Sequence, residues 1–238
     1  MLAFEIENLK KVWPGENSFT LSINSLQVKT GERVALVGVS GSGKSTLLDI
    51  LALSMPPDTA NKFFLNSYTR GKVDILKKWD KKAIDQLTCI RKEVMGYILQ
   101  TGGLFPFLTV RRNISLCNDL VHGRNTFDLE GLAGRLGLVN HLDKLPSQLS
   151  VGERQRVAIG RALAHGPDVI IADEPTASLD PITSRNIMQI FTELTDEKGV
   201  TVIMATHDWQ GADDNGFRQI KFDVKRDTDR GVVAHVQG

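Results

Sequence analysis

The feature that most constrains this chain is a glycine-rich nonapeptide at residues 38–46, Gly-Val-Ser-Gly-Ser-Gly-Lys-Ser-Thr. It fits the pattern GxxxxGK[ST]. The apolar run 33–37 before it predicts a buried strand, and the segment 46–53 after it predicts a helix. Strand, loop and helix in this order define a P-loop. A plain Gly/Ser-rich turn is the alternative, and it does not account for the flanking strand and helix.

The residue types of this loop suit a nucleotide phosphate. Glycines let backbone N–H groups curl round phosphate oxygens, and a helix N-terminus adds a favourable dipole. We expect Lys44 to reach the β- and γ-phosphates and the Ser45 hydroxyl to ligate Mg²⁺. The expected cofactors are therefore ATP and Mg²⁺. The predicted nucleotide-binding residues in this loop are Gly38, Ser40, Gly41, Ser42, Gly43, Lys44, Ser45 and Thr46.

Composition fits an enzyme subunit with a sizeable core. The chain has 238 residues, 41% of them hydrophobic, and a net charge of +1, so no basic field points to nucleic acid. No apolar run approaches the ~20 residues that span a bilayer. Glu5 stands where a secretory signal would be basic and then apolar. We expect a cytoplasmic protein, peripheral on the inner face of the cytoplasmic membrane, with Cys89 and Cys117 reduced.

Periodicity outlines the elements that carry the motifs. Alternating runs at 4–9 and 19–28 predict antiparallel strands, and buried strands are expected at 95–99, 168–173 and 200–205. Helices are expected at 80–90, 154–164 and 182–194, with helical periodicity also dominating 101–149. The tail segments 217–224 and 231–236 predict a closing hairpin or edge strands.

A second catalytic element follows the apolar run 169–172. Asp173 ends this run, so it is expected at the carboxyl edge of the sheet, where α/β proteins bind ligands. There it can hold Mg²⁺ through water, and Glu174 can polarise an attacking water as general base. Alone, such a run is also typical of an ordinary strand end. Its pairing with the P-loop favours the catalytic interpretation.

These segments, with others between them, resemble the ATP-binding cassette (ABC) ATPases over nearly the whole chain. The matching elements occur in the family's order: Trp13, the P-loop at 38–46, Gln100, the signature at 149–153, the strand and acids at 169–174, the D-loop at 178–180, and His207. The resemblance implies that Glu174, His207 and Gln100 are catalytic. It also implies that Ser45, Gln100 and Asp173 hold the metal.

The resemblance extends the nucleotide-binding set to Trp13, which would stack on adenine, and to Ser150, Gly152 and Asp180. Ser150 and Gly152 would reach the γ-phosphate bound by an opposite subunit. Each position also has a structural interpretation. Trp13 can cover a turn, Gln100 and His207 can be solvated, and Asp180 is a natural helix cap before a proline.

The signature departs from the family's LSGGQ at two positions. Glu153 replaces Gln, a change the resemblance tolerates, and Val151 replaces the first Gly. A β-branched residue removes backbone freedom at a crowded helix N-terminus and adds bulk. We therefore expect a weaker clamp on ATP and slow or partner-dependent turnover.

The resemblance is strongest to the small ATPases of the lipoprotein-release, macrolide-export and cell-division group. It implies an α/β fold: a P-loop NTPase core of mainly parallel sheet, an N-terminal antiparallel β subdomain and a helical lobe. We expect one ABC ATPase domain over 1–238, with 1–100 and 165–238 forming the core and 101–164 the lobe. Within the lobe, Arg111 and Arg112 stand where an acid is usual, which would alter the coupling helix that the groove accepts.

The predicted function is an ATP-hydrolysing, nucleotide-binding subunit that dimerises on ATP and drives a separate transmembrane permease, without inserting into the membrane itself. The partner copy would make a homodimer or heterodimer. One alternative is a soluble ABC-type ATPase acting on the ribosome or DNA, although the chain lacks a second cassette or a coiled-coil insertion. Another is an ATP-binding regulatory subunit with weak turnover. The sequence leaves the cargo and the direction of transport open.

Overall fold

The computed structural model describes residues 1–15, 18–123, 127–227 and 231–237. Its strands are β1 (Leu2–Trp13), β2 (Phe19–Lys29), β3 (Arg33–Val37), β4 (Lys62–Ser67), β5 (Gly71–Asp74), β6 (Met95–Ile98), β7 (Val169–Asp173), β8 (Thr201–Ala205), β9 (Arg218–Asp227) and β10 (Gly231–Gln237). Its helices are α1 (Lys44–Leu51), α2 (Ile75–Asp80), α3 (Ile84–Val94), α4 (Val110–His122), α5 (Leu129–Arg135), α6 (Val151–Leu163), α7 (Pro181–Lys198) and α8 (Trp209–Asp214), with 3-10 turns at Val139–His141 and Pro146–Gln148.

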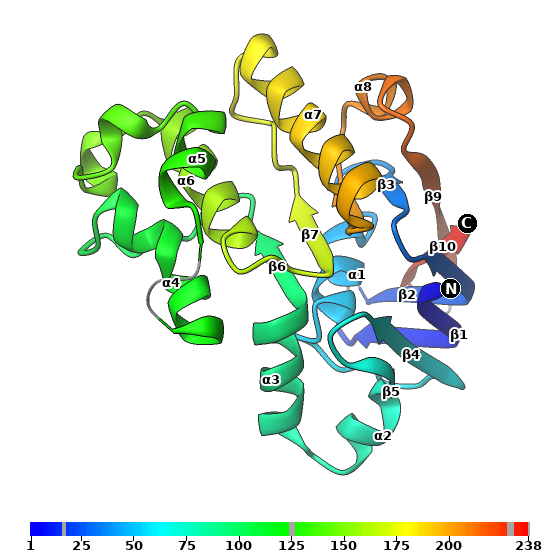
Figure 1. Cartoon of the computed structure of the whole chain (residues 1–238). Coiled ribbons are helices and arrows are strands. Elements are labelled where there is room, and N and C mark those ends of the chain that lie inside the picture. The colour runs from blue at the N-terminus through cyan, green and yellow to red at the C-terminus, as the bar shows by residue number, and fades with distance from the viewer. Residues whose placement is uncertain (16–17, 124–126, 228–230, 238) are drawn as a thin grey trace.

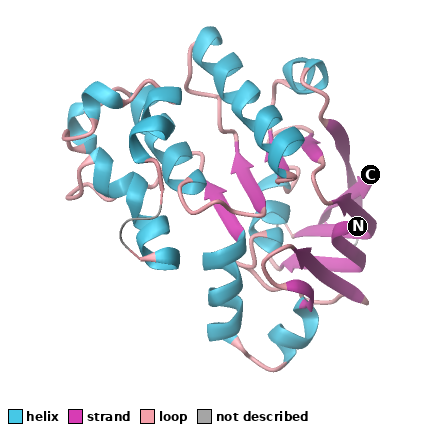
Figure 2. Ribbon diagram, viewed as in Figure 1, coloured by secondary structure: helices cyan, strands magenta, loops and turns pink. Residues whose placement is uncertain are grey.

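All of these strands join one sheet in the order β5-β4-β1-β2-β10-β9-β3-β8-β7-β6. The strands β9, β3, β8, β7 and β6 are mutually parallel, whereas β1 pairs antiparallel with β2 and β4. The antiparallel strands lie at a steep angle to β6 and β7, so the sheet curls (Figure 2). The predicted α/β class, with its parallel core and N-terminal antiparallel part, is confirmed.

Alternate residues of the parallel strands pack against opposite layers. Ile171 of β7 and Ile203 of β8 belong to the cluster that contains α1, whereas Ile170 and Val202 belong to the cluster that contains α7. Side chains of successive strand residues point to opposite faces, so a strand covered on both faces is apolar throughout. The continuous apolar runs that predicted buried strands are explained by these two helical layers.

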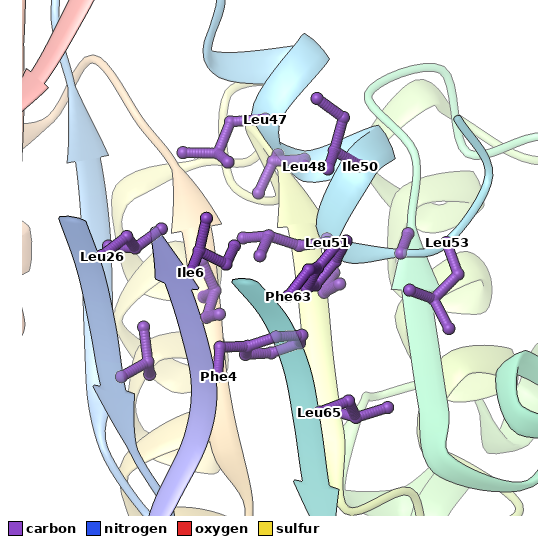
Figure 3. Packing of buried hydrophobic residues seen from close by; sticks show 14 of the residues in the cluster. Phe4, Ile6, Leu26, Leu47, Leu48, Ile50, Leu51, Leu53, Phe63 and Leu65 are labelled. Atoms are coloured by element: carbon purple, nitrogen blue, oxygen red, sulfur yellow. The ribbon is translucent and has the colours of Figure 1, made fainter. Parts of the chain in front are cut away.

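Helix α1 also closes the core beneath the antiparallel strands. Figure 3 shows its apolar side chains facing those of β1, β2 and β4, the labelled residues being Leu47, Leu48, Ile50 and Leu51 on the helix and Phe4, Ile6, Leu26, Phe63 and Leu65 on the strands. The P-loop helix therefore packs against both the antiparallel and the parallel part of the sheet. Its N-terminus is fixed relative to both.

Helices α4, α5 and α6 lie together on one side of the molecule (Figure 1). They fall within the predicted lobe, of which residues 124–126 lie outside the described part of the chain. The boundaries at 101 and 164 stay a prediction. In the described part, no helix is long and apolar enough to cross a membrane.

The structure corrects several of the expected elements. The helix expected at 80–90 is α3, which begins only at Ile84, because Lys82 takes a left-handed backbone (φ 50°) after the unexpected short helix α2. Strands β4 and β5 were not expected, and much of 101–149 is turn and 3-10 helix. The tail does form a hairpin, but it is not at an edge. β10 pairs with β2 and β9 with β3, so the hairpin joins the two parts of the sheet.

Candidate functional site

The P-loop leads from β3 into α1 and wraps round the Lys44 ammonium. Lys44 Nζ donates to the carbonyl oxygens of Gly38 at 2.8 Å and of Val39 at 3.0 Å. Gly41 and Gly43 take left-handed backbones, with φ of 76° and 95°, which side chains rarely adopt. This conformation explains why the loop needs glycine at both positions.

The loop offers polar groups suited to an anion. Ser42 Oγ is buried and has no hydrogen-bond partner among the described residues. Gly43 caps α1 without a side chain, so the N–H groups of the first turn have no side-chain acceptor from the cap. Burial lowers the pKa of Lys44, and the charges of Glu174 and Asp173 oppose this shift. The loop therefore fits a phosphate group, because a cation, a buried hydroxyl and the N-terminus of a helix lie together there.

Three neighbouring strands bring Gln100, Glu174 and His207 together. Glu174 Oε1 lies 2.7 Å from His207 Nε2, and Gln100 Nε2 donates to Glu174 Oε2 at 3.4 Å. These residues follow β6, β7 and β8, whose carboxyl ends meet at one edge of the sheet. The three predicted catalytic side chains thus form one cluster.

The backbone at Glu174 is unusual. Glu174 has a φ of 48°, and its N–H donates to the Ala205 carbonyl at 3.0 Å. A left-handed backbone at a residue that is not glycine costs free energy and is often found at functional sites. Here it turns the chain sharply after Asp173 and directs the Glu174 carboxylate to His207.

Asp173 is half-buried at the end of β7, and its charge acts on both Lys44 and Tyr97. Tyr97 of β6 donates through its hydroxyl to Asp49 Oδ1 of α1 at 2.8 Å. Burial and this bond raise the Tyr97 pKa, so the phenol stays neutral. Sequence reasoning missed this tie between the P-loop helix and β6. A tyrosine inside an apolar strand was the available signal, since a buried phenol needs a partner.

Trp13 forms part of an aromatic pair beside the P-loop. Its ring centroid lies 5.9 Å from that of Phe19, and the Lys11 ammonium lies 5.7 Å from the Trp13 ring centroid. Phe19 in turn contacts Gly43 so closely that a Cβ there would lie 2.8 Å from Phe19 Cζ. Phe19 was not predicted, although it opens the second strand. It connects the expected adenine platform to the phosphate loop.

Ser150 caps the signature helix α6 in a reciprocal capping box. Its hydroxyl accepts from the Glu153 N–H at 3.2 Å, and the Glu153 carboxylate accepts from the Ser150 N–H at 2.7 Å. This backbone bond holds the Glu153 pKa below its usual value. The glutamate in place of the family's glutamine therefore serves the helix cap.

Val151 begins α6 with 58% of its surface exposed and is not among the residues with positive φ. Valine therefore avoids the left-handed backbone that would favour glycine at this position. A Cβ at Gly152 would meet Leu179 Cδ2 and the Ser178 carbonyl oxygen, each at 3.4 Å. The predicted signature and D-loop segments are thus neighbours in this chain.

Asp180 caps α7. Its Oδ1 accepts from the N–H groups of Ile182 and Thr183, each at 3.0 Å, and its pKa is lowered chiefly by the hydrogen bonds from Thr183.

The signature helix α6 is separated from the P-loop helix. In Figure 1, α6 lies on the far side of β6 and β7 from α1. The chain therefore carries two separate groups of predicted site residues. The P-loop, Asp173 and the Gln100, Glu174 and His207 cluster form one, and the signature with the D-loop forms the other.

Fold and site together define a P-loop nucleotide-binding protein of the ATP-binding cassette type. The sequence profile of the family described as ABC transporter matches residues 21–177. The uncharacterized ABC transporter ATP-binding protein YbbA of Escherichia coli K12 is 40% identical over 216 residues, which cover 87% of this chain and 88% of YbbA. The chain belongs to the ABC transporter family.

Two further relatives differ in length. The lipoprotein-releasing system ATP-binding protein LolD of Aquifex aeolicus is 39% identical over 206 residues, covering 85% of this chain and 86% of LolD. The macrolide export ATP-binding/permease protein MacB of Syntrophobacter fumaroxidans is 39% identical over 189 residues, covering 77% of this chain. The chain spans only 25% of that MacB.

A solved structure supports the same assignment. The ATP-binding cassette MJ0796, seen as a dimer in a post-hydrolysis state bound to ADP and Pi, aligns with a TM-score of 0.78 and 34% identity. The alignment covers 92% of this chain and 93% of MJ0796. The predicted family is confirmed, including the likeness to the lipoprotein-release and macrolide-export group.

Proposed function

We propose that this chain is the ATP-hydrolysing, nucleotide-binding subunit of an ABC transporter complex. The observation that carries the proposal is the position of the Glu174 carboxylate. It is held by Gln100 and His207 at the ends of three adjacent strands, and its charge acts on Lys44 of the P-loop. An acid beside a phosphate-binding lysine is placed to activate a water for attack on the terminal phosphate.

Each residue has a distinct role in this proposal. Lys44 and the P-loop N–H groups bind the β- and γ-phosphates, and Trp13 with Phe19 supports the adenine. Glu174 accepts a proton from the attacking water. His207 then donates a hydrogen bond to the γ-phosphate, since the imidazole that now holds Glu174 is 53% exposed and free to turn towards a ligand.

The side chains present fit Mg²⁺ as the cofactor. Ser45 is exposed in the first turn of the P-loop helix, and Asp173 is the last residue of β7, where its charge acts on Lys44. The Gln100 side chain is hydrogen-bonded to the Glu174 carboxylate. Hydroxyl, carboxylate and amide oxygens are the ligands this hard cation prefers. Bound there, it would neutralise the negative charge that grows on the phosphates during transfer.

The second group of residues explains why two copies are needed. Helix α6, which Ser150 caps and which contains Gly152, lies across β6 and β7 from the P-loop helix α1 of the same chain (Figure 1). We propose that Ser150 and Gly152 contact the nucleotide bound by a second subunit, with Asp180 at the same interface, so that ATP is sandwiched between two chains. The dimeric state of MJ0796 supports this arrangement.

The work of the ATP cycle would pass to a transmembrane permease. LolD is described as part of a lipoprotein-releasing system, and MacB as an ATP-binding/permease protein. We infer that this chain, peripheral on the inner face of the cytoplasmic membrane, drives such a partner through the exposed segment near Phe105 and Phe107. These relatives favour transport over a role at the ribosome or on DNA.

Replacement of Glu174 by glutamine tests the proposal. Glu174→Gln keeps the size and one oxygen but removes the base, so ATP hydrolysis is expected to be abolished while ATP binding persists. In the presence of ATP the variant should elute as a dimer. Glu197→Gln, at an exposed position of α7, is the matched control and should behave as wild type. Undiminished turnover in Glu174→Gln would remove this residue from the catalytic role.

A further inference from the structure

The segment after Gln100 turns through two glycines. Gly102 and Gly103 have φ values of 74° and 56°, and the Gly102 N–H donates to the Leu99 carbonyl at 3.0 Å. Consecutive left-handed residues leave both glycine carbonyl oxygens without a helix or strand partner, so they need hydrogen-bond donors from elsewhere. Those partners come from a single side chain on α6.

Arg161 supplies both hydrogen bonds. Its Nη1 donates to the Gly103 carbonyl at 2.8 Å, and its Nη2 donates to the Gly102 carbonyl at 2.9 Å. The guanidinium is half-buried, and burial lowers its pKa. A planar guanidinium can hold two acceptors at fixed positions, which an ammonium cannot. Arg161 therefore fixes the geometry of this turn as well as its distance from α6.

The rest of the contact is close packing along one face of α6. A Cβ at Gly102 would lie 3.6 Å from Gln155 Oε1 and 3.7 Å from Ala158 Cβ. Gln155, Ala158 and Arg161 are spaced by three residues, so they share a helix face. Gln155 is buried, with 3% of its surface exposed. The turn thus lies directly on the helix that Ser150 caps.

The same arginine also lies near the exposed aromatic segment that follows. Its guanidinium carbon lies 6.0 Å from the Phe105 ring centroid, and the Phe105 ring lies 5.8 Å from that of Phe107. Phe107 is 73% exposed. Arg161 therefore touches both the turn that carries Gln100 and the segment proposed to face the permease.

The two attachments of the Gln100 turn differ in the length of their hydrogen bonds. Its amide reaches Glu174 over 3.4 Å, a long hydrogen bond, whereas the turn two residues away is held by two short bonds from a charged donor. We propose that Arg161 is a positioning residue that fixes the Gln100 turn to the signature helix, so that Gln100 and Ser150 move as one unit. This inference deepens the proposed function and rests on it.

A double-mutant cycle tests the proposal. Arg161→Met keeps an apolar stem but removes both hydrogen bonds. If Arg161 acts through Gln100, Arg161→Met should lower kcat by about 2- to 30-fold, the range seen for residues within a coupling network. In a Gln100→Ala background the same change should lower kcat by less than about twofold, because the residue it positions is already gone. Arg161→Lys, which keeps the charge, should restore part of the rate.

Arg156→Met is the matched control. Arg156 lies on the same helix and also donates to backbone carbonyls, those of Leu136 at 2.8 Å and Gly137 at 3.4 Å, but not to the Gln100 turn. Its effect on kcat should be the same with Gln100 or with alanine at position 100. An equal loss from Arg161→Met in both backgrounds would overturn the proposal.

Amide hydrogen exchange gives a readout that needs no turnover. In nucleotide-free protein, Arg161→Met should raise exchange in peptides covering 100–105, and Arg156→Met should not. Unchanged exchange there in Arg161→Met would also refute the proposal. Failure of the proposed function would give a different experimental result. The wild-type chain would then not hydrolyse ATP at all, while the exchange experiment would still decide whether Arg161 holds the turn. If Arg161→Met does not fold, Arg161→Lys is compared in the same two backgrounds, with a smaller expected loss of kcat, because an ammonium keeps the charge but not the paired donors.

Discussion

Gly96 in the middle of β6 is the position where the smallest change should have a large effect on stability. A Cβ built on Gly96 would lie 2.3 Å from the Ala162 carbonyl oxygen and 3.2 Å from Pro167 Cγ. The first of these atoms is backbone at the end of α6, so no side-chain rotation can relieve the overlap. Since favourable contacts begin near 3.5 Å, the helix end must retreat by about 1 Å.

We expect Gly96→Ala to cost about 1–3 kcal/mol, the range for overpacking a dense core. For a chain of this size that corresponds to a fall in melting temperature of about 2–12 °C. The free energy of unfolding should be measured by urea denaturation, comparing midpoints at constant slope. The loss would be a sizeable part of the about 5–15 kcal/mol that stabilises a typical domain.

Gly134→Ala is the matched control. Gly134 lies in α5, and a Cβ there would meet nothing within 4 Å. Alanine is favoured over glycine in a helix by about 1 kcal/mol, so this variant should be as stable as wild type or more so. If Gly96→Ala proved as stable as Gly134→Ala, the close approach of α6 to β6 would not hold in solution.

Three further predictions follow from the site. Lys44→Ala should impair hydrolysis of any nucleotide. Trp13→Ala should mainly raise the Kd for ATP, by about 5- to 150-fold if a base stacks there. An unchanged Kd for Trp13→Ala in nucleotide titration would place the adenine platform elsewhere. Val151→Gly should raise the basal ATPase rate by removing bulk where the second subunit's nucleotide would bind, and an equal or lower rate would show that valine is accommodated without penalty. Because the folded-state pKa of Glu153 is lowered, its stabilisation of the Ser150 cap is present above the unfolded value of 4.5 and is lost as pH falls through the folded pKa. The stability difference between wild type and Glu153→Gln should therefore shrink as pH falls below 4.5, and a constant difference in urea midpoints would contradict this assignment.

The sequence determined those features that depend on neighbouring residues. The P-loop was predictable because its glycines, lysine and flanking elements lie within about twenty residues, and the same holds for the strand that ends at Asp173. The cap at Asp180 was also predictable, since a cap forms with the next residues of its own helix. The roles of all these residues stay predictions until the variants above are measured.

Only the tertiary structure decided which distant segments meet. Gln100 and Glu174 are 74 residues apart, and they are neighbours because β6 and β7 lie side by side in the sheet. No local sequence pattern marks the contact of Phe19 with Gly43 or the hydrogen bonds of Arg161 to the turn after Gln100. Strand order and helix packing arise from the burial of apolar surface over the whole chain. Because many strands have similar local sequences, the sequence of one strand does not specify which other strand it pairs with. The physical reason is that periodicity tells which face of an element is buried, whereas the partner of that face is chosen by the fold.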